Sequence, residues 1–533
     1  MVAVLQVFDQ PVPASDVVPA TIDAWSADPP SAFSWPAPFP GVIAHMVDFY
    51  RRYLDEVMRQ DDTDLRNVLL LGRRPMQLLA LIQFALWTEA ARMRGQRMTG
   101  HDILDYLAGI GDSPPETLQV MPLPVVPARF LTLRRLVRTG SWTPAWRLPR
   151  AVLRPGGVAL THNSLLRSYL RHSRYAVRNA YDEDFNLANG SVDATFAKRM
   201  EAPALAGQMV ETLTGELPVN EDIQARLATC MRLVLTESYG DSIDLLSRLR
   251  AVRKLPSKLF TGTGSKRMSR ALGLEIMHRG GEVTRCDHGG SFQLVHDSDY
   301  VVLNELSVST RFIVATQLAA KNSDALASQR RAHSLSDCVI EGSRGDPGLD
   351  VGAPAFTRTA SLKGRRRVMY VPSLFYGLNQ ASPPVLPGAL YLDWQLRLMT
   401  MLKEFPVEIL WKPHPAGHKP PIHLSPTRDF RTLAAPFEQA VAEADILIYD
   451  FSATTTLAVG LCTDRPIVLI DHGTMRFNAS LRHEISARCR MVECAYNDRN
   501  LPTVSRESLE DAVCSGPPTA DPTYFRQLFL GDA

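Results

Sequence analysis

Residues 436–471 read PFEQAVAEADILIYDFSATTTLAVGLCTDRPIVLID, and they alternate between helical and strand patterns. Residues 436–444 and 452–461 have helical spacing, whereas DILIYD (445–450) and PIVLID (466–471) are short, continuous apolar runs. Such runs between helices are typical of strands that are buried on both faces of a sheet. Strict alternation of strand and helix therefore predicts a parallel, doubly wound sheet.

The same alternation extends toward the N-terminus. RRVMYVPS (366–373) and VEILWKPHP (407–415) have strand patterns, and residues 390–406 between them have a helical pattern. Residues 258–290 read as a strand, a Gly-rich turn, a helix, a second strand and a loop, which is a βαβ unit. We expect further strands at 67–72, 156–163, 299–305 and 311–316.

A segment without periodicity separates the two α/β patterns. Residues 331–366 are rich in Gly, Pro, Ser and Asp, so we place an interdomain crossover there. We predict four parts: an N-terminal arm and helix (1–60), an α/β domain (61–340) with a helical insertion at about 164–250, a second α/β domain (341–500), and a C-terminal tail (501–533).

Composition narrows the class of protein. The chain has 533 residues, with 58 Lys and Arg against 56 Asp and Glu, so its net charge is +2. This balance argues against a nucleic-acid partner bound by bulk charge. Seven cysteines without a CxxC pair argue for a reducing compartment. The first 16 residues lack a secretory pattern, and the apolar run 75–87 is too short to cross a bilayer, so we expect a cytoplasmic protein.

The first candidate site is the sequence KPHP. Lys412, His414 and Pro415 follow a predicted strand, and ligands of open α/β sheets bind at that end of the strands. The prolines restrict the loop, so that the two cationic or polar side chains can meet a phosphate. A structural histidine that caps a turn is the alternative reading.

The second candidate is the helix start after DILIYD. Ser452, Thr454 and Thr455 stand where hydroxyl groups cap free backbone amides. The same amides and hydroxyls can bind an anion. We expect this loop and the KPHP loop on adjacent strands, where one phosphate can contact both.

The third candidate is DHGG, residues 287–290. His288 follows a predicted strand, and Asp287 can orient its ring, so that the pair can serve as a general base. Gly289 and Gly290 allow close approach of the backbone to a neighbour. The alternative is a turn with an exposed histidine.

Weaker signals complete the set. Gly262, Gly264 and Ser265 in FTGTGSKR precede a helix, so a phosphate or sugar could approach them, although the Walker A spacing is absent. His162 and Asn163 follow another predicted strand. HExxH is absent and no Asp-x-Asp stands at a strand end, so we predict no metal site.

The order of DHGG, KPHP and a D-x-S-x-T junction resembles the GT-B glycosyltransferases. It is similar to CDP-glycerol glycerophosphotransferases and to capsule and surface-polysaccharide transferases that use CMP-activated sugars, including the Kdo and polysialic acid enzymes. The resemblance covers mainly residues 258–316 and 366–472. It departs from the family where Ala453 replaces the second Ser of a Ser-Ser pair and where the acidic motif of bacterial sialyltransferases is absent.

This resemblance implies a fold and an activity. It implies two Rossmann-like domains that face a cleft, with His414, Pro415 and Ser452 at the nucleotide phosphate and His288 with Gly289 supplying a base. The expected reaction is metal-independent sugar transfer from a nucleotide sugar to a glycan or lipid-linked acceptor, with no cofactor. Phosphoryl-alditol transfer, a catalytically silent binding module and a sugar-nucleotide epimerase remain alternatives. Peripheral contact with a membrane or with a polysaccharide-assembly complex also remains open.

Overall fold

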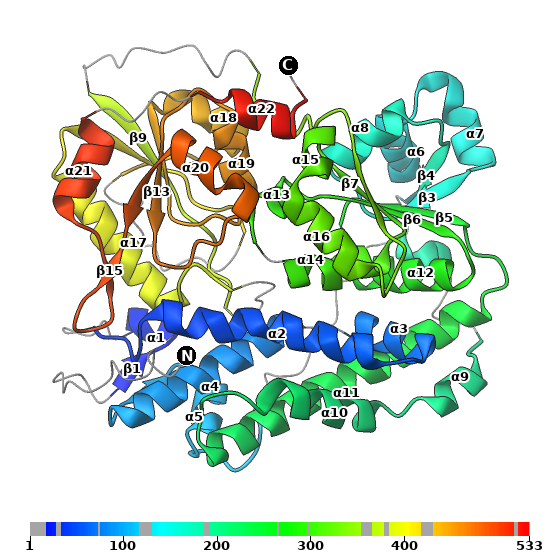
Figure 1. The fold of residues 1–533 in the computed structure, drawn as a ribbon, viewed down its shortest axis with the longest axis horizontal. Helices are drawn as coiled ribbons and strands as arrows, with labels where there is room; N and C mark the ends of the chain where they lie inside the picture. Colours follow the sequence, from blue (N-terminus) through cyan, green and yellow to red (C-terminus); the bar gives the residue numbers. More distant parts are fainter. Residues whose placement is uncertain are drawn as a thin grey trace.

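A computed structural model describes most of the chain. The described residues are 17–27, 33–72, 75–116, 131–185, 191–263, 266–296, 298–352, 365–377, 383–416, 430–515 and 521–531. They form two α/β lobes that lie side by side above a layer of helices (Figure 1).

The C-terminal lobe contains a six-stranded, wholly parallel sheet. Its strand order is β11 (Arg431–Thr432), β10 (Val407–Trp411), β9 (Arg366–Val371), β12 (Ile446–Tyr449), β13 (Ile467–Asp471) and β14 (Cys489–Glu493). This is the 3-2-1-4-5-6 order of a doubly wound, Rossmann-like sheet. The order reverses between β9 and β12. The predicted parallel α/β class is confirmed for this half of the chain.

The N-terminal lobe contains a second parallel sheet of six strands. Its order is β4 (Val177–Asn179), β3 (Gly157–Ala159), β5 (Lys258–Thr261), β6 (Glu282–Cys286), β7 (Arg311–Val314) and β8 (Val339–Gly342). Its strand order corresponds to 2-1-3-4-5-6, which reverses between β3 and β5. Two small sheets pair β1 (Val17–Pro19) with β2 (Arg97–Thr99) and β15 (Ala495–Tyr496) with β16 (Pro502–Thr503).

Helices flank both sheets, and most of them connect successive strands. In the N-terminal lobe these are α6 (Leu131–Trp142), α7 (Leu148–Leu153), α8 (Ser164–His172), α12 (Arg267–His278), α13 (Ser291–Leu294), α14 (Ser298–Asn304), α15 (Gln317–Lys321) and α16 (Ser323–Ala332). In the C-terminal lobe they are α17 (Gly388–Lys403), α18 (Phe437–Ala440), α19 (Thr455–Leu461), α20 (Arg482–Arg488) and α21 (Arg506–Cys514).

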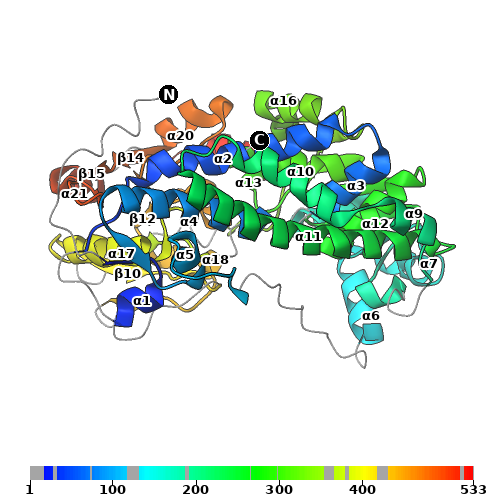
Figure 2. The ribbon, with the colours of Figure 1, turned by 90° about the horizontal axis from the view of Figure 1, so that it is seen from below.

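The remaining helices form a layer beneath both lobes (Figure 2). They are α1 (Ile22–Ala27), α2 (Phe39–Arg59), α3 (Thr63–Leu71), α4 (Pro75–Met93), α5 (Asp102–Leu107), α9 (Ala194–Arg199), α10 (Ala202–Thr214) and α11 (Glu221–Ala251). Helices of the predicted arm and of the predicted insertion thus share one layer. Trp35, just before α2, exchanges backbone and side-chain hydrogen bonds with Arg499 and Asn500, whereas Asp55 in α2 pairs with Arg331 of the N-terminal lobe at 2.9 Å.

Direct contacts also join the two lobes. The Asn478 side chain donates to the carbonyls of Phe292 and Gln293, and the His296 amide donates to Arg476 at 2.7 Å. Helix α22 (Thr523–Phe529) returns from the C-terminal lobe and lies between the lobes in Figure 1. The Thr316 hydroxyl donates to the Leu528 carbonyl near the end of that helix, at 2.7 Å. Hydrogen bonds therefore fix the relative position of the lobes at the edge where the loops meet.

Two predicted strands are wrong. Residues 67–72 lie largely in α3, where the Asp62 side chain accepts from the amides of Asp64 and Leu65, and residues 299–305 lie largely in α14. Each run is buried by neighbouring helices, and a short apolar run is compatible with either a buried strand or a buried helix. Residues 75–87 form part of the buried helix α4, as predicted.

Among the described residues, no helix has both the length and the apolar content needed to cross a membrane.

Candidate functional site

The DHGG loop lies at the carboxyl end of β6, where the predicted base was placed. Asp287 is 4% exposed, and its Oδ1 atom accepts from the amides of His288 and Phe292 at 2.7 and 3.2 Å. The side chain of His288 is exposed, whereas Gly289 and Gly290 are buried. The carboxylate therefore shapes the loop backbone, and this backbone presents His288 outward.

Asn163 connects three of the predicted loops. It is the N-cap of α8, and its Nδ2 atom donates to the carbonyls of Gly262 and Asp287 at 2.8 and 2.7 Å. A Cβ atom on Gly262 would lie 2.5 Å from the Asn163 amide nitrogen, so this glycine permits contact between two loops. The Asn163 side chain thus links the loops after β3, β5 and β6. The sequence indicated Asn163 only as one of the weaker signals. Gly264 and Ser265 lie outside the described residues.

The Asp287 carboxyl is unusual in its electrostatics. Its second oxygen, Oδ2, is buried and has no hydrogen-bond partner among the described residues. Burial raises the pKa of this carboxyl to about 7, and the two amide donors only partly oppose the shift. A carboxyl that titrates near neutral pH is suited to exchange a proton.

A second buried carboxyl lies near this loop. Asp346, 3% exposed, follows β8, and its amide donates to the Phe529 carbonyl at the end of α22. Burial raises the pKa of Asp346, while the side chains of Ser164 and His288 lower it. The negative charge of Asp346 also contributes to the raised pKa of Asp287. Asp346 lies within the aperiodic crossover, where no local pattern distinguished it from other loop residues.

We expect Asp287 to make stability depend on pH. Its pKa in the folded protein lies above the unfolded value of about 3.9, so the folded state retains a proton that the unfolded chain releases. The free energy of unfolding therefore falls as the pH rises from about 4 to about 7, by up to about 4 kcal/mol from this group. Asp287→Asn removes this titration and keeps an acceptor oxygen for the loop amides. Urea unfolding across this range should show the variant gaining stability over wild type as the pH rises, whereas parallel curves would contradict the assignment.

In the C-terminal lobe, the second candidate loop follows β12. Asp450, at the end of the strand, is fully buried and accepts from the hydroxyls of Tyr370 and Tyr391 and from the indole of Trp394. Burial raises its pKa to about 6 despite these donors. Asp450 therefore anchors the loop and is not available to a ligand.

The residues after Asp450 reach the start of α19. Ser452 is buried, and Thr454 is the N-cap, with its Oγ1 atom accepting from the Thr456 amide at 3.0 Å. Thr455 is exposed. The capping function predicted for this position is therefore present, and the Thr455 side chain, including its hydroxyl, lies against Gly289 of the other lobe.

The KPHP loop follows β10, as predicted, but it is not on a strand adjacent to β12. Strand β9 lies between them, so that the two strand axes are about 10 Å apart. The Nδ1 atom of His414 caps its own turn at the amide of Ala416, 3.1 Å away. The Lys412 side chain is 7% exposed and donates to the Pro413 carbonyl, and burial lowers its pKa. The exposed Pro415 ends this turn. The loops after β10 and β12 still share the carboxyl edge of this sheet, because the sheet is wholly parallel.

The two lobes bring separate candidates into contact at this edge. A Cβ atom on Gly289 would lie 2.8 Å from the Cγ2 atom of Thr455, so the DHGG loop packs directly against the start of α19. Gly290 packs in the same way against Phe529 of α22. The candidate base and the candidate anion-binding helix start thus come from different lobes and meet at one point.

Two other features lie outside this arrangement. A cavity of about 600 Å³ is lined by α17 residues together with Trp25 and Val504, and none of the predicted site residues lines it. Among the residues that the structure describes, no group of three His, Cys, Asp or Glu side chains is placed to hold a metal ion.

Comparison with known proteins adds no assignment, because no family model matches the chain and no curated protein matches it.

Proposed function

We propose that this protein is a metal-independent glycosyltransferase of the GT-B type that uses a nucleotide-activated sugar. The observation that carries the proposal is the contact between the His288–Gly290 loop of one lobe and the Thr454–Thr455 helix start of the other. A transfer reaction between two substrates needs a base on one side and a site for the leaving phosphate on the other. The two loops that we propose to supply these groups meet at the carboxyl edges of both sheets.

The C-terminal lobe is the proposed donor domain. In a 3-2-1-4-5-6 sheet, a nucleotide binds where the strand order reverses, which here is between β9 and β12. Lys412 and His414 flank this position after β10, and Ser452 and Thr455 flank it after β12. A phosphate above the end of β9 would therefore have donors on both sides.

The proposed chemistry is attack of an acceptor hydroxyl on the activated sugar carbon. A new carbon–oxygen bond forms as the bond to the phosphate oxygen breaks, and the nucleotide leaves with both bonding electrons. His288 accepts the hydroxyl proton, while the buried Asp287 holds the loop backbone through the amides of His288 and Phe292. The hydroxyls at the start of α19, with Lys412 and His414, stabilise the charge on the leaving phosphate.

Nucleotide binding tests the proposal first. We expect one of CMP, CDP, UDP and GDP to raise the melting temperature of the purified protein. At about 100 times its dissociation constant, a ligand stabilises the folded state by about 2.7 kcal/mol. His414→Ala should abolish this shift, because it removes a donor to the phosphate. The matched control is His333→Ala. His333 follows α16, its side chain is 75% exposed, and its replacement should leave the melting shift unchanged.

Turnover of the matching donor then distinguishes the rival functions. Release of nucleotide from a nucleotide sugar in the presence of an acceptor supports glycosyl transfer, whereas release from a CDP-alditol identifies phosphoryl-alditol transfer. Conversion of the donor without an acceptor indicates an epimerase. Binding without turnover indicates a silent module, and the absence of any nucleotide shift would remove the basis for assigning His414 and Ser452.

A further inference from the structure

One segment of the N-terminal lobe has a charge very different from that of the whole chain. Residues 131–180 contain ten arginines and no Asp, Glu or Lys, although the chain as a whole has a net charge of only +2. A local excess of this size creates a positive field that the rest of the protein does not have. The segment therefore has a distinct electrostatic role.

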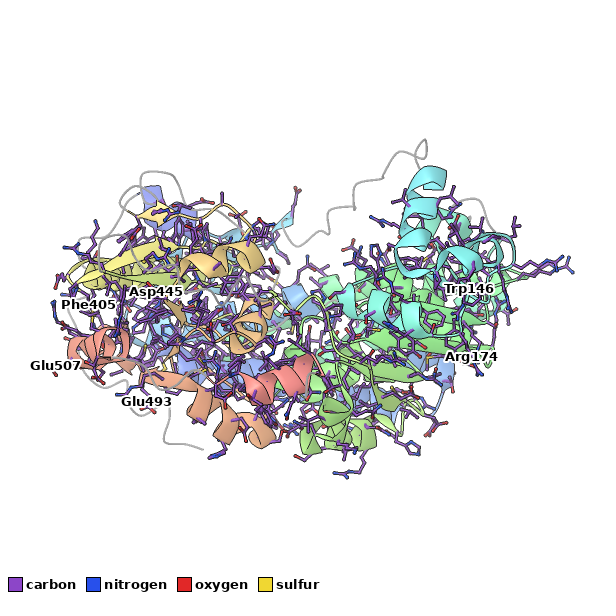
Figure 3. All side chains as sticks on the ribbon, turned by 90° about the horizontal axis from the view of Figure 1, so that it is seen from above. Trp146, Arg174, Phe405, Asp445, Glu493 and Glu507 are labelled. Carbon is purple, nitrogen blue, oxygen red and sulfur yellow. The ribbon has the colours of Figure 1, made fainter. Side chains whose placement is uncertain are left out.

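The fold places this segment together at one end of the molecule. It comprises α6, α7, α8 and the strands β3 and β4, and β4 is the edge strand of its sheet. Helices α6 and α7 both pack against β4. In Figure 3, Trp146 and Arg174 lie at this end, which is opposite the end that carries Phe405 and Glu507. We call the exposed surface of residues 135–154 the arginine face.

Large apolar side chains are exposed among these arginines. Trp146 is 75% exposed, Leu153 is 79% exposed and Val137 is 67% exposed. All seven tryptophans lie in described segments, and the other six are at most 8% exposed. Helices α6 and α7 contact each other, so these apolar side chains lie on neighbouring elements, and exposed apolar groups gathered among polar ones mark interaction surfaces.

In the second half of the arginine face, the apolar and basic side chains recur at the spacing of residues on one side of a helix. Trp146, Arg150 and Leu153 are separated by four and three residues along the consecutive helical turns at 145–147 and 148–153, so they project in similar directions. The Arg147 guanidinium lies over the Trp146 ring, 4.3 Å from its centroid, and holds it. Arg135 pairs with Asp184, whereas no described carboxylate forms an ion pair with Arg150 or Arg154, which are both exposed. Their charge is therefore available to a partner.

We propose that the arginine face docks this protein on the surface of an anionic lipid membrane. Arginine guanidinium groups bind lipid phosphates, and tryptophan with aliphatic side chains enters the boundary between headgroups and acyl chains. A nucleic acid would satisfy the arginines but would leave Leu153 and Val137 in water. An acidic protein surface would likewise leave the aliphatic side chains without an apolar partner.

The surface adjoins the candidate site. Trp142 at the end of α6 packs against the ring of His162, with centroids 5.6 Å apart, and His162 precedes the loop-linking residue Asn163. Arg138 and Arg167 lie close enough to His162 to contribute to lowering its pKa, to about 4, although burial is the larger cause. Docking through this face would place the carboxyl edge of the N-terminal sheet near the lipid. The membrane proposal does not depend on the proposed reaction.

Vesicle binding by the full chain tests this inference. We expect the protein to sediment with vesicles of phosphatidylcholine containing 30% phosphatidylglycerol, and to bind pure phosphatidylcholine vesicles at least tenfold more weakly. Arg150→Glu with Arg154→Glu should reduce binding to the anionic vesicles at least tenfold, as should Trp146→Ser with Leu153→Ser. The matched controls are Arg253→Glu with Lys254→Glu, and Leu233→Ser, which alter exposed residues outside the arginine face. These controls should bind as wild type does.

Tryptophan fluorescence gives a second, local readout. Trp146 is the exposed tryptophan, so brominated lipids should quench the part of the bound protein's emission that comes from Trp146. Trp146→Phe should abolish this quenching and leave sedimentation with the vesicles largely unchanged. Failure of wild type to bind anionic vesicles, equal loss of binding in the control variants, or quenching that persists in Trp146→Phe would each overturn the proposal. None of these results depends on nucleotide binding or turnover.

Discussion

Replacement of His288 by alanine should lower the rate of the proposed sugar transfer by about 10²- to 10⁴-fold, which is the usual contribution of a positioned general base. His288 is exposed at the meeting point of the lobes, and the buried Asp287 precedes it in the same loop. The substitution removes a proton acceptor but leaves the donors of the C-terminal lobe in place. The nucleotide-dependent rise in melting temperature should therefore be unchanged.

The measurement is single-turnover transfer with saturating donor, beside the melting shift in the same preparation. His333→Ala again provides the control, because its imidazole is exposed and lies outside the candidate site. If His288→Ala keeps the wild-type rate, then His288 is not the base. Asp287 would be the next candidate, because burial raises its pKa to about 7.

Replacement of Gly289 by alanine should both destabilise the protein and disable the site. Gly289 has a φ of +64°, and its new methyl group would lie 2.8 Å from Thr455 Cγ2. The backbone conformation costs about 1–2 kcal/mol for a residue with a Cβ atom. The clash across the lobes adds about 1–3 kcal/mol more, or displaces the loop. A displacement of about 1 Å at a reacting group can reduce the rate about 100-fold.

Gly95 provides a closely matched control for this substitution. Its φ of +68° is almost the same, but a Cβ atom there would have no neighbour within 4 Å. Gly95→Ala therefore carries the backbone cost without the contact between the lobes. Urea unfolding should show a larger loss of stability in Gly289→Ala than in Gly95→Ala. Single-turnover transfer should be slower in Gly289→Ala and unchanged in Gly95→Ala. Equal effects in the two variants would show that the contact with Thr455 has no consequence.

The C-terminal lobe was largely predictable from local patterns. Strands β9, β10, β12 and β13 fall within the predicted runs, because each is a short apolar segment bounded by turn residues and followed by a helical pattern. The runs at 67–72 and 299–305 are also short and have an apolar centre, yet they form parts of α3 and α14. A residue buried on all sides has the same apolar requirement in either structure, so packing against neighbouring helices decided between them.

The candidate loops show the same division. The types of residue at 287–290, 412–415 and 452–455 could be connected with proton transfer and anion binding from the sequence alone. The arrangement of these loops could not be predicted from the sequence. Strand β9 lies between β10 and β12 and separates loops that were predicted to be neighbours. Strand order depends on which segments pair across long stretches of chain, and no local pattern records that choice.

The sequence by itself determined the α/β class, the parallel sheets and the chemical character of the loops, because periodicity and residue type are local properties. Only the tertiary structure placed Gly289 against Thr455 and buried Asp346 near the DHGG loop. Each of these relations joins residues that are distant in the chain or that lie on different elements. They arise when apolar faces are buried together, and that process brings polar loops into positions that the loops themselves do not specify.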